Sequence, residues 1–359
     1  MKRILFIASH RPGRAPGQRF RFEMFFDALE KHGFECELSY LLNEKDDRDF
    51  YKKGNYLRKF QIGIKSYWIR FRDLFRLHKF DLVVIFREAL PSRSIFFERI
   101  VIWKGIPIVF DFDDAIWIRD VSKANQSIAW LKNPDKIRKI LPHCKAVTAG
   151  NAYLAEFASQ YNSDVYVVPS TIDELIHKPI SIQKPRITIG WSGSMTTVIH
   201  FELIIPVLRK LRERYGDKIE IVTIGAQSSY SEELSIRYIP WCKERENEDL
   251  NHLDIGLMPL PDDEWAKGKC GMKALLYMAA GKVTVASPVG VNSSIIEHGK
   301  NGYLAQKEED WFAVICDLVD SEDLRTRVGE QARVDVVARY SKSVWIEKLV
   351  DIYHSSCYP

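Results

Sequence analysis

The stretch WAKGKCGMKALLYMAAGKVTVAS, from Trp265 to Ser287, decides the fold. It opens with a turn that contains two lysines and two glycines, continues as an apolar helical segment, and ends in a short strand over 283–286. Another apolar strand, 255–258, precedes it. Strand, loop, helix and strand in this order form the βαβ unit of a parallel sheet, which binds ligands at the carboxyl ends of its strands.

The turn itself places Lys267 and Lys269 around Gly268, with Gly271 at the start of the helix. Glycine lets the backbone approach a ligand closely, and a helix start presents unpaired N–H groups that carry about half a positive charge. We interpret the turn as an anion site for a diphosphate. A solvated basic loop in front of a buried helix is the alternative.

The same alternation of strands and helices runs through the whole chain. Strands are expected at 4–8, 36–41, 82–86, 107–112, 146–149 and 165–168, and again at 187–191, 219–224, 236–239, 255–258 and 283–286. A proline-rich stretch over 171–186 breaks the pattern and is predicted to be an interdomain linker. We therefore predict an α/β protein with Rossmann-like domains at 1–170 and 187–340, followed by a C-terminal helix over 341–359 that is free to cross back to the first domain.

Composition agrees with two folded domains. The chain has 359 residues, of which 46% are hydrophobic and 28% charged. Its six cysteines are far apart and form no C-x-x-C pair, which favours a reducing cytoplasm over a disulfide framework or a zinc site. The opening apolar run is too short for a signal peptide, and we expect no membrane span.

A second candidate phosphate contact follows the strand at 187–191, in the sequence IGWSGSMTT. Gly193 permits a tight turn, and Ser194 and Thr196 offer hydroxyl or backbone donors at a helix start. Plain helix capping explains the same residues equally well.

From Ile187 onward the order of IGWSGS, DIGLMPL, GKCGMKALLYMAAGKVTVASPVGVNSSIIEHGKNGYLA and ARYSKSVWIEKL resembles the donor half of a GT-B glycosyltransferase of family four. The resemblance implies two Rossmann-like domains that face each other across a cleft. It also implies sugar transfer with retention, from a nucleotide-diphosphate sugar, without a metal. No cofactor is expected, because the nucleotide-sugar is a substrate.

The chain departs from that family at four positions. The family's arginine and lysine after the first donor-domain strand align with Ser194 and Ile199, and its two glutamates align with Gly268 and Leu276. We expect Lys267 and Lys269 to replace the missing phosphate charges, at ~1.5 to 3 kcal/mol per contact. Lys273 is expected to share a helical face with Lys269 and to reach phosphate or sugar, or else to neutralise nearby acids.

The predicted donor-binding set combines these segments with Trp241, which the resemblance places near the base and which a buried structural role would explain as well. Its members are Gly193, Ser194, Thr196, Trp241, Lys267, Lys269, Cys270, Gly271, Met272 and Lys273.

An acidic cluster, DFDDAIW, begins at the end of the strand expected at 107–112. Asp111, Asp113 and Asp114 cannot all ionise cheaply unless solvent or a cation intervenes. The D-x-D spacing suggests a metal site, but this architecture normally needs none, so we predict no metal. Asp114 and, second, Asp113 are the candidate catalytic residues, to stabilise the transition state or orient the acceptor hydroxyl. Helix capping is the alternative role.

Basic residues of the first domain are candidates for the acceptor. The loop SHRPGRAPGQRFR contains Arg11, Arg14, Arg19 and Arg21, and Arg87 ends another strand. We select Arg14, Arg19 and Arg87 as acceptor-binding residues; an ordinary solvated basic loop is the alternative.

The window 51–80 holds nine lysines and arginines against one acid, Asp73, and eight aromatic residues. This net charge of +8 in one window fits peripheral contact with an anionic membrane, helix packing with a solvated basic face, or nucleic acid. Lipid-linked acceptors favour the membrane, and we expect no nucleic-acid partner.

Together these features predict a cytoplasmic, hexosyltransferase-like enzyme that transfers a sugar to a glycan or lipid-linked glycan in cell-surface polysaccharide synthesis, peripheral at the inner face of the membrane. The alternatives are a catalytically inactive nucleotide-sugar-binding subunit and a nucleotide-sugar epimerase or hydrolase of the same fold.

Overall fold

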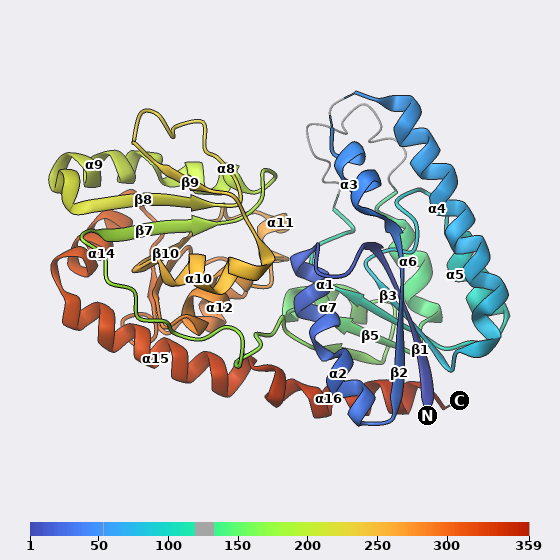
Figure 1. Ribbon diagram of the computed structural model, residues 1–359. Coiled ribbons are helices and arrows are strands. Elements are labelled where there is room, and N and C mark those ends of the chain that lie inside the picture. Colours follow the sequence, from blue (N-terminus) through green and yellow to red (C-terminus); the bar gives the residue numbers. More distant parts are fainter. Residues whose placement is uncertain (53, 119–132, 359) are drawn as a thin grey trace. The chain divides into compact units, whose positions relative to one another are not determined.

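The computed structural model describes residues 1–52, 54–118 and 133–358. The chain forms two compact units (Figure 1). Unit 1 comprises Met1–Ser170 and Trp345–Pro359, and unit 2 comprises Thr171–Val344. Each unit is built around its own six-stranded sheet.

The sheet of unit 1 is parallel throughout and has the strand order β2-β1-β3-β4-β5-β6. Its strands are β1 (Lys2–His10), β2 (Phe34–Leu42), β3 (Leu82–Phe86), β4 (Ile108–Phe112), β5 (Ala146–Ala149) and β6 (Val165–Val167). All six were predicted from continuous apolar runs, which are typical of parallel strands buried on both faces. Their carboxyl ends meet at one edge, so the segments after His10, Phe86 and Phe112 share that edge.

Helices cover this sheet: α1 (Pro16–Arg21), α2 (Phe26–Lys31), α3 (Glu44–Phe50), α4 (Tyr56–Arg76), α5 (Phe96–Trp103), α6 (Lys136–Ile140), α7 (Ala152–Ser159) and α16 (Lys342–Ser356). The core joins the β1 side chains Ile4 and Phe6 to Leu349 and Tyr353 of α16. The C-terminal helix therefore completes the core of unit 1, although most of the sequence just before it belongs to unit 2.

The sheet of unit 2 is also parallel, with the order β12-β11-β10-β7-β8-β9. Its strands are β7 (Ile187–Ser192), β8 (Ile219–Ile224), β9 (Arg237–Ile239), β10 (Ile255–Met258), β11 (Val283–Ala286) and β12 (Tyr303–Leu304). The first five match the predicted strands. The sequence analysis missed β12, because two residues are too few to show a strand period.

The helices of unit 2 are α8 (Val198–Phe201), α9 (Ile205–Tyr215), α10 (Glu246–Asn251), α11 (Glu264–Lys267), α12 (Met272–Ala279), α13 (Asn292–Ile295), α14 (Glu308–Asp320) and α15 (Glu322–Tyr340). A Cβ on Gly329 of α15 would lie 2.3 Å from the carbonyl oxygen of Gly281, so only glycine lets α15 pack on the turn between α12 and β11.

Residues 171–186, predicted as a linker, lie within unit 2. The Ile180 N–H donates to Asn251 Oδ1 at 2.7 Å, and Lys184 Nζ lies 2.7 Å from Asp254 Oδ2. These contacts fix the segment against the loop and helix that precede β10.

Two further properties follow from the described part of the chain. All six cysteines are free thiols. Among the residues that the structure describes, no helix has both the length and the apolar composition to cross a membrane.

Candidate functional site

The turn that contains Lys267 and Lys269 lies after β10, at the carboxyl edge of the unit 2 sheet, as predicted. Lys267 ends α11 and forms an ion pair with Glu264, at 2.8 Å between Nζ and Oε1. This hydrogen bond raises the pKa of Lys267. Lys269 Nζ lies 4.8 Å from the ring centroid of Trp265. Both lysines are partly exposed, and the acidic residues directly before the turn, Asp262, Asp263 and Glu264, are exposed as well.

Two glycines hold this turn in place. Gly271 has a φ of +70° and directly precedes α12, where a Cβ would lie 2.3 Å from Ile295 Cδ1. Gly290, in the loop after β11, has a φ of +55°, and a Cβ there would lie 2.8 Å from the Lys267 carbonyl oxygen. The lysine turn is therefore packed directly against the loop that follows the next strand.

The start of α12 places the remaining donor-binding candidates of this segment. Lys273 Nζ lies 5.6 Å from the ring centroid of Trp191 in β7. Cys270 is buried, with Sγ 3.8 Å from the Gly268 carbonyl oxygen, whereas Met272 is half-buried. Lys269 precedes α12, so the expectation that Lys269 and Lys273 share a helical face was wrong.

The turn after β7 lies at the same edge of the sheet. The Gly193 N–H donates to the Ile224 carbonyl at the end of β8, at 2.9 Å. A Cβ on Gly225, whose φ is +91°, would lie 2.5 Å from the Gly193 carbonyl oxygen, so the turns after β7 and β8 are packed together. Ser194 Oγ lies 2.8 Å from Thr196 Oγ1, and both residues are exposed. These two hydroxyl groups are hydrogen-bonded to each other. Because both residues are exposed, phosphate binding and helix capping are both compatible with their positions.

The positions of the two missing family glutamates are buried. Gly268 and Leu276 face the protein, and Leu276 is followed by the fully buried Tyr277. The Tyr277 hydroxyl oxygen accepts the Ser192 N–H at 2.7 Å and so fixes the end of β7 from α12. Sequence analysis missed this residue; its one signal was Gly256, where a Cβ would lie 2.4 Å from the Tyr277 ring.

Trp241 follows β9 and is half-buried. Its indole N–H donates to Glu246 Oε1 at 2.8 Å, and Glu246 Oε2 lies 3.8 Å from His177 Nε2. The ring is thus held by its polar edge while part of its surface stays accessible, which a base-contacting residue requires. The fully buried tryptophan of this unit is Trp191.

In unit 1 the acidic cluster divides into two separate ion pairs. Asp111, in β4, is buried and accepts two hydrogen bonds from Arg21, one of them at 3.1 Å from Nε, and a third from Thr148 Oγ1 at 2.6 Å. Arg21 also donates to the Val168 carbonyl. Asp111 and Arg21 therefore form a structural pair, and the suggestion that Arg21 binds an acceptor phosphate was wrong.

Asp113 and Asp114 share a different arginine. Arg87, after β3, lies with Nε 2.6 Å from Asp113 Oδ1 and Nη2 2.5 Å from Asp114 Oδ2. Its φ is +61°, a left-handed conformation that is rare for arginine, and its N–H donates to the Asp111 carbonyl at 2.7 Å. A Cβ on Gly17 would lie 2.7 Å from Asp113 Oδ2. Two arginines thus supply the positive charge that the three neighbouring carboxylates require: Arg21 pairs with Asp111, and Arg87 pairs with Asp113 and Asp114.

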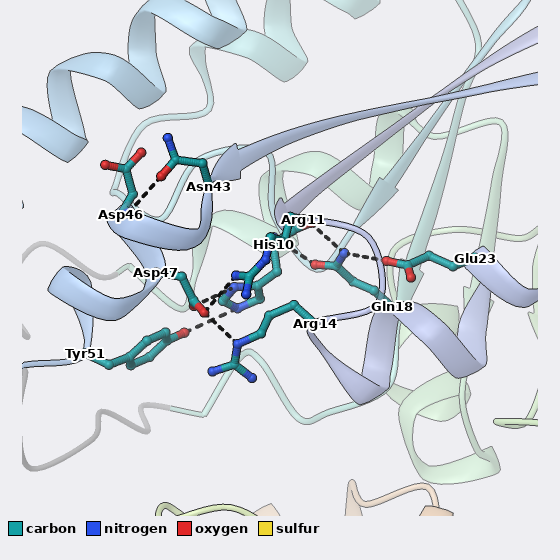
Figure 2. Close-up of polar contacts among 9 residues, drawn as sticks. All are labelled: His10, Arg11, Arg14, Gln18, Glu23, Asn43, Asp46, Asp47 and Tyr51. Atoms are coloured by element: carbon teal, nitrogen blue, oxygen red, sulfur yellow. Dashed lines mark hydrogen bonds and ion pairs between the residues drawn. The ribbon is translucent and has the colours of Figure 1, made fainter. Parts of the chain in front are cut away.

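Arg14 lies in a second cluster at this edge, drawn in Figure 2, where the loop after β1 meets α3. Arg14 Nε lies 2.6 Å and Arg11 Nη1 3.1 Å from Asp47 Oδ2, and His10 Nδ1 lies 3.5 Å from Asp47 Oδ1. Burial raises the pKa of Asp47, but the neighbouring His10 and Arg14 side chains outweigh it and hold the pKa well below its usual range. The Tyr51 hydroxyl lies 3.3 Å from His10 Nε2 at the edge of this cluster.

Sequence analysis did not identify Asp47, because its position in a charged stretch, NEKDDRDF, gave no sign that it would be buried. Arg19, the third acceptor-binding candidate, is buried in α1, with its guanidinium 4.7 Å from the Phe20 ring centroid. Of the three arginines, Arg14 and Arg87 are therefore partly accessible, while Arg19 is largely enclosed.

No group of three His, Cys, Asp or Glu side chains suited to a metal ion occurs within 1–52, 54–118 and 133–358. The D-x-D pair separates because Arg21 holds Asp111 and Arg87 holds Asp113.

Two Rossmann-like units with these strand orders define a GT-B fold, and solved structures agree. Sucrose-phosphate synthase from Thermosynechococcus elongatus superposes with a TM-score of 0.70, at 11% identity over 99% of both chains. The Anabaena protein HepE, in complex with UDP and glucose, superposes with a TM-score of 0.65, at 13% identity over 99% of this chain and 100% of that one.

Residues 186–321, which lie within unit 2, match the family described as glycosyl transferases group 1. D-inositol 3-phosphate glycosyltransferase from Corynebacterium urealyticum is 27% identical over 186 residues, which are 46% of this chain and 42% of that protein. The chain spans less than half the length of the curated relatives that it matches.

Proposed function

We propose that this protein is a glycosyltransferase that moves a sugar, with retention, from a nucleoside-diphosphate sugar to a glycan or lipid-linked glycan in cell-surface polysaccharide synthesis. The proposal includes a hexosyl donor, no metal requirement and a cytoplasmic site of action. The observation that carries it is the turn of Lys267 and Lys269, which lies at the carboxyl edge of the sheet and within the residues that match the group 1 family.

Unit 2 is proposed to bind the donor. Lys267 and Lys269 supply positive charge beside the start of α12, whose first N–H groups favour an anion. Lys273, Gly193, Ser194 and Thr196 are assigned to the phosphate and sugar, and Trp241 to the base. HepE, a protein of the same fold, binds UDP and glucose, which supports a uridine nucleotide as the first donor to test.

Unit 1 is proposed to supply the acceptor site and the catalytic carboxylates. Asp114 and Asp113 stabilise positive charge on the transferred sugar or orient the acceptor hydroxyl, and Arg87 pairs with both carboxylates. Arg14 is assigned to an anionic group of the acceptor. The similarity to a D-inositol 3-phosphate glycosyltransferase is consistent with such a group.

The donor assignment is tested by the shift in thermal unfolding with UDP, GDP, ADP, CMP and TDP. A ligand at ~100 times its Kd stabilises a protein by ~2.7 kcal/mol, which shifts the midpoint measurably. We expect one diphosphate to raise the midpoint of the wild type and not that of Lys267→Ala with Lys269→Ala. No shift with any nucleotide, or an undiminished shift in the double variant, contradicts the assignment.

A matched control is available within the same unit. Lys300 forms the same type of ion pair as Lys267, with Glu297 three residues earlier and also at 2.8 Å, and it lies in the turn before β12, at the opposite edge of the sheet. Lys300→Ala with the exposed Lys218→Ala removes two lysines and should leave the nucleotide response unchanged.

The absence of both family glutamates favours two alternatives. In an inactive binding subunit, the nucleotide shift is retained but labelled sugar never leaves the donor. In a hydrolase or epimerase, the donor is consumed at the same rate with and without an acceptor extract. Acceptor-dependent transfer that Asp114→Asn abolishes supports the proposed enzyme over both.

A further inference from the structure

We propose that unit 1 carries a docking surface for membranes with anionic headgroups, formed by the outer face of α4 and by a basic pocket beside α5. This inference does not depend on the proposed sugar transfer. It starts from α4, which runs along one flank of unit 1 with α5 packed beside it (Figure 1).

The helix α4 exposes its apolar face to solvent, whereas a surface helix of a soluble protein normally buries that face. Its apolar side chains recur every three or four residues and are 42–72% exposed: Leu57, Phe60, Ile64, Trp68, Phe71 and Phe75. At this spacing they share one face of the helix. Soluble proteins seldom expose so continuous an apolar face unless it binds a partner.

The opposite face of α4, which is buried, is unusually polar. Arg70 and Asp73 are completely buried and form an ion pair at 3.1 Å. Arg70 also donates to the carbonyls of Ala8 and Ala89, each at 2.8 Å. Removing either partner would leave a buried charge uncompensated, so this network fixes the rotation of the helix and holds its apolar face outward.

A basic pocket of about 350 Å³ lies beside α5, the helix that packs against α4. The described residues that line it include four basic side chains and no acidic one: Arg93, Arg99, Lys136 and Lys139. Lys136 is paired with Glu88, whereas the other three are exposed and have no ion pair within the described residues. Phe96 of α5 lines the pocket and is 45% exposed.

One side-chain contact connects α4 to the chain segment that leads into the pocket. The Tyr67 hydroxyl on α4 lies 2.9 Å from Ser92 Oγ, and Ser92 directly precedes the segment that lines the pocket. Trp103, at the end of α5, is 82% exposed and adds to the apolar surface. The result is one surface that joins an apolar face to exposed arginine and lysine side chains.

This combination favours a bilayer over other partners. An interfacial helix buries Trp, Phe and Leu at the headgroup boundary while Lys and Arg attract anionic lipid. Single-stranded nucleic acid stacks its bases on rings, but Leu57 and Ile64 share the face and offer none. The proposal thus names the surface through which residues 51–80 would contact a membrane. Lys53, which belongs to this window, lies outside the described residues.

The test is sedimentation of the full chain with phosphatidylcholine vesicles that contain or lack phosphatidylglycerol. We expect binding only with phosphatidylglycerol, and weaker binding at high salt. Two variants remove the two parts of the surface: Trp68→Ser with Phe71→Ser, and Arg93→Gln with Arg99→Gln and Lys139→Gln. The charge variant should bind about 100-fold more weakly, and the apolar variant at least about tenfold more weakly.

Matched controls change the same residue types in unit 2. Leu175→Ser with Ile176→Ser removes two side chains that are 80% and 60% exposed, and Arg186→Gln with Lys218→Gln and Lys243→Gln removes three exposed charges. Both controls should bind vesicles like the wild type. All variants alter exposed side chains, so their unfolding midpoints should match the wild type.

Three results would overturn the proposal. The first is a wild type that does not bind anionic vesicles. The second is an α4 or pocket variant that binds as the controls do. The third is a wild type that does not bind vesicles but binds a labelled oligonucleotide, or self-associates in size-exclusion chromatography. If the α4 and pocket variants abolish that interaction, the surface binds nucleic acid or a second copy of the chain.

Discussion

Arg87 binds Asp113 from a strained backbone: its Nε lies 2.6 Å from Asp113 Oδ1 while its φ is +61°. Non-glycine residues occupy this region at a cost, and such strain concentrates at functional sites. The same guanidinium reaches Asp114, so one side chain organises both candidate catalytic carboxylates.

This strain predicts a difference between two substitutions of Arg87. Arg87→Gly and Arg87→Ala both remove the guanidinium, but glycine tolerates the left-handed backbone. We expect Arg87→Gly to be about 1 kcal/mol more stable than Arg87→Ala in urea unfolding. Both should lower kcat/KM for transfer by about 10- to 100-fold. Equal stabilities would show that the backbone stores no strain, and full activity in either variant would remove Arg87 from the site.

Gly17 leaves room for the Asp113 carboxylate. A Cβ at residue 17 would lie 2.7 Å from Asp113 Oδ2 and 2.9 Å from Phe86 Cζ. Gly17→Ala should therefore displace the carboxylate and lower transfer activity by about tenfold or more. Gly63→Ala is the control, since a Cβ there meets nothing within 4 Å. It should keep full activity and gain up to about 1 kcal/mol of helix stability. Equal transfer activities of Gly17→Ala and Gly63→Ala would show that the space at Gly17 is not needed for catalysis.

Gly290 supports the lysine turn, and Gly299 provides a control with similar backbone strain. Both have positive φ, +55° and +80°, but only at Gly290 would a Cβ meet protein, 2.8 Å from the Lys267 carbonyl oxygen. The left-handed backbone alone should cost each alanine variant about 1 kcal/mol of folding stability, and the contact with Lys267 should make Gly290→Ala the less stable of the two. Gly290→Ala alone should also reduce the nucleotide-induced rise in the unfolding midpoint. If Gly299→Ala reduces that rise equally, the turn is not the nucleotide site.

Asp47 predicts a pH-dependent contribution to stability. Its folded pKa is below the unfolded value of ~3.9, so its carboxylate stabilises the fold above that pH, and this stabilisation is lost as pH falls through the folded pKa. Asp47→Asn should cost about 1 to 3 kcal/mol at pH 7. Urea unfolding from pH 7 to pH 3.5 should show this difference narrowing below about pH 4.

The control for Asp47 is Asp217→Asn, at an exposed residue for which the described residues provide no ion pair. Its effect should stay near zero across the same range. A destabilisation by Asp47→Asn that does not change with pH would mean that its packing, and not its charge, stabilises the loop after β1.

Strands and turns were predictable because their signals are local. β3, β5, β8, β10 and β11 were predicted residue for residue from short apolar runs bounded by polar segments. The lysine turn was placed correctly at a strand end because a βαβ unit fixes which edge of the sheet a loop occupies. The missing family glutamates were likewise evident from aligned letters alone.

The partner of each charged group was not predictable in this way. Arg21 and Asp111 are separated by 90 positions in the chain, and Arg87 and Asp113 by 26. The local sequence does not show that Asp111 has a structural role and Asp113 does not, because both belong to the same D-x-D motif. Asp47 reads as one acid among several, and only folding buries it beneath His10, Arg11 and Arg14.

The sequence by itself determined the two α/β units, their strand segments and the position of the basic turn, because hydrophobic period and glycine placement act over a few residues. Only the tertiary structure decided which carboxylates are neutralised, which arginines remain accessible and which face of α4 meets solvent. Those outcomes depend on desolvation and on contacts between distant segments. In α4, the buried ion pair of Arg70 and Asp73 faces the protein, so the apolar side chains of the helix face solvent.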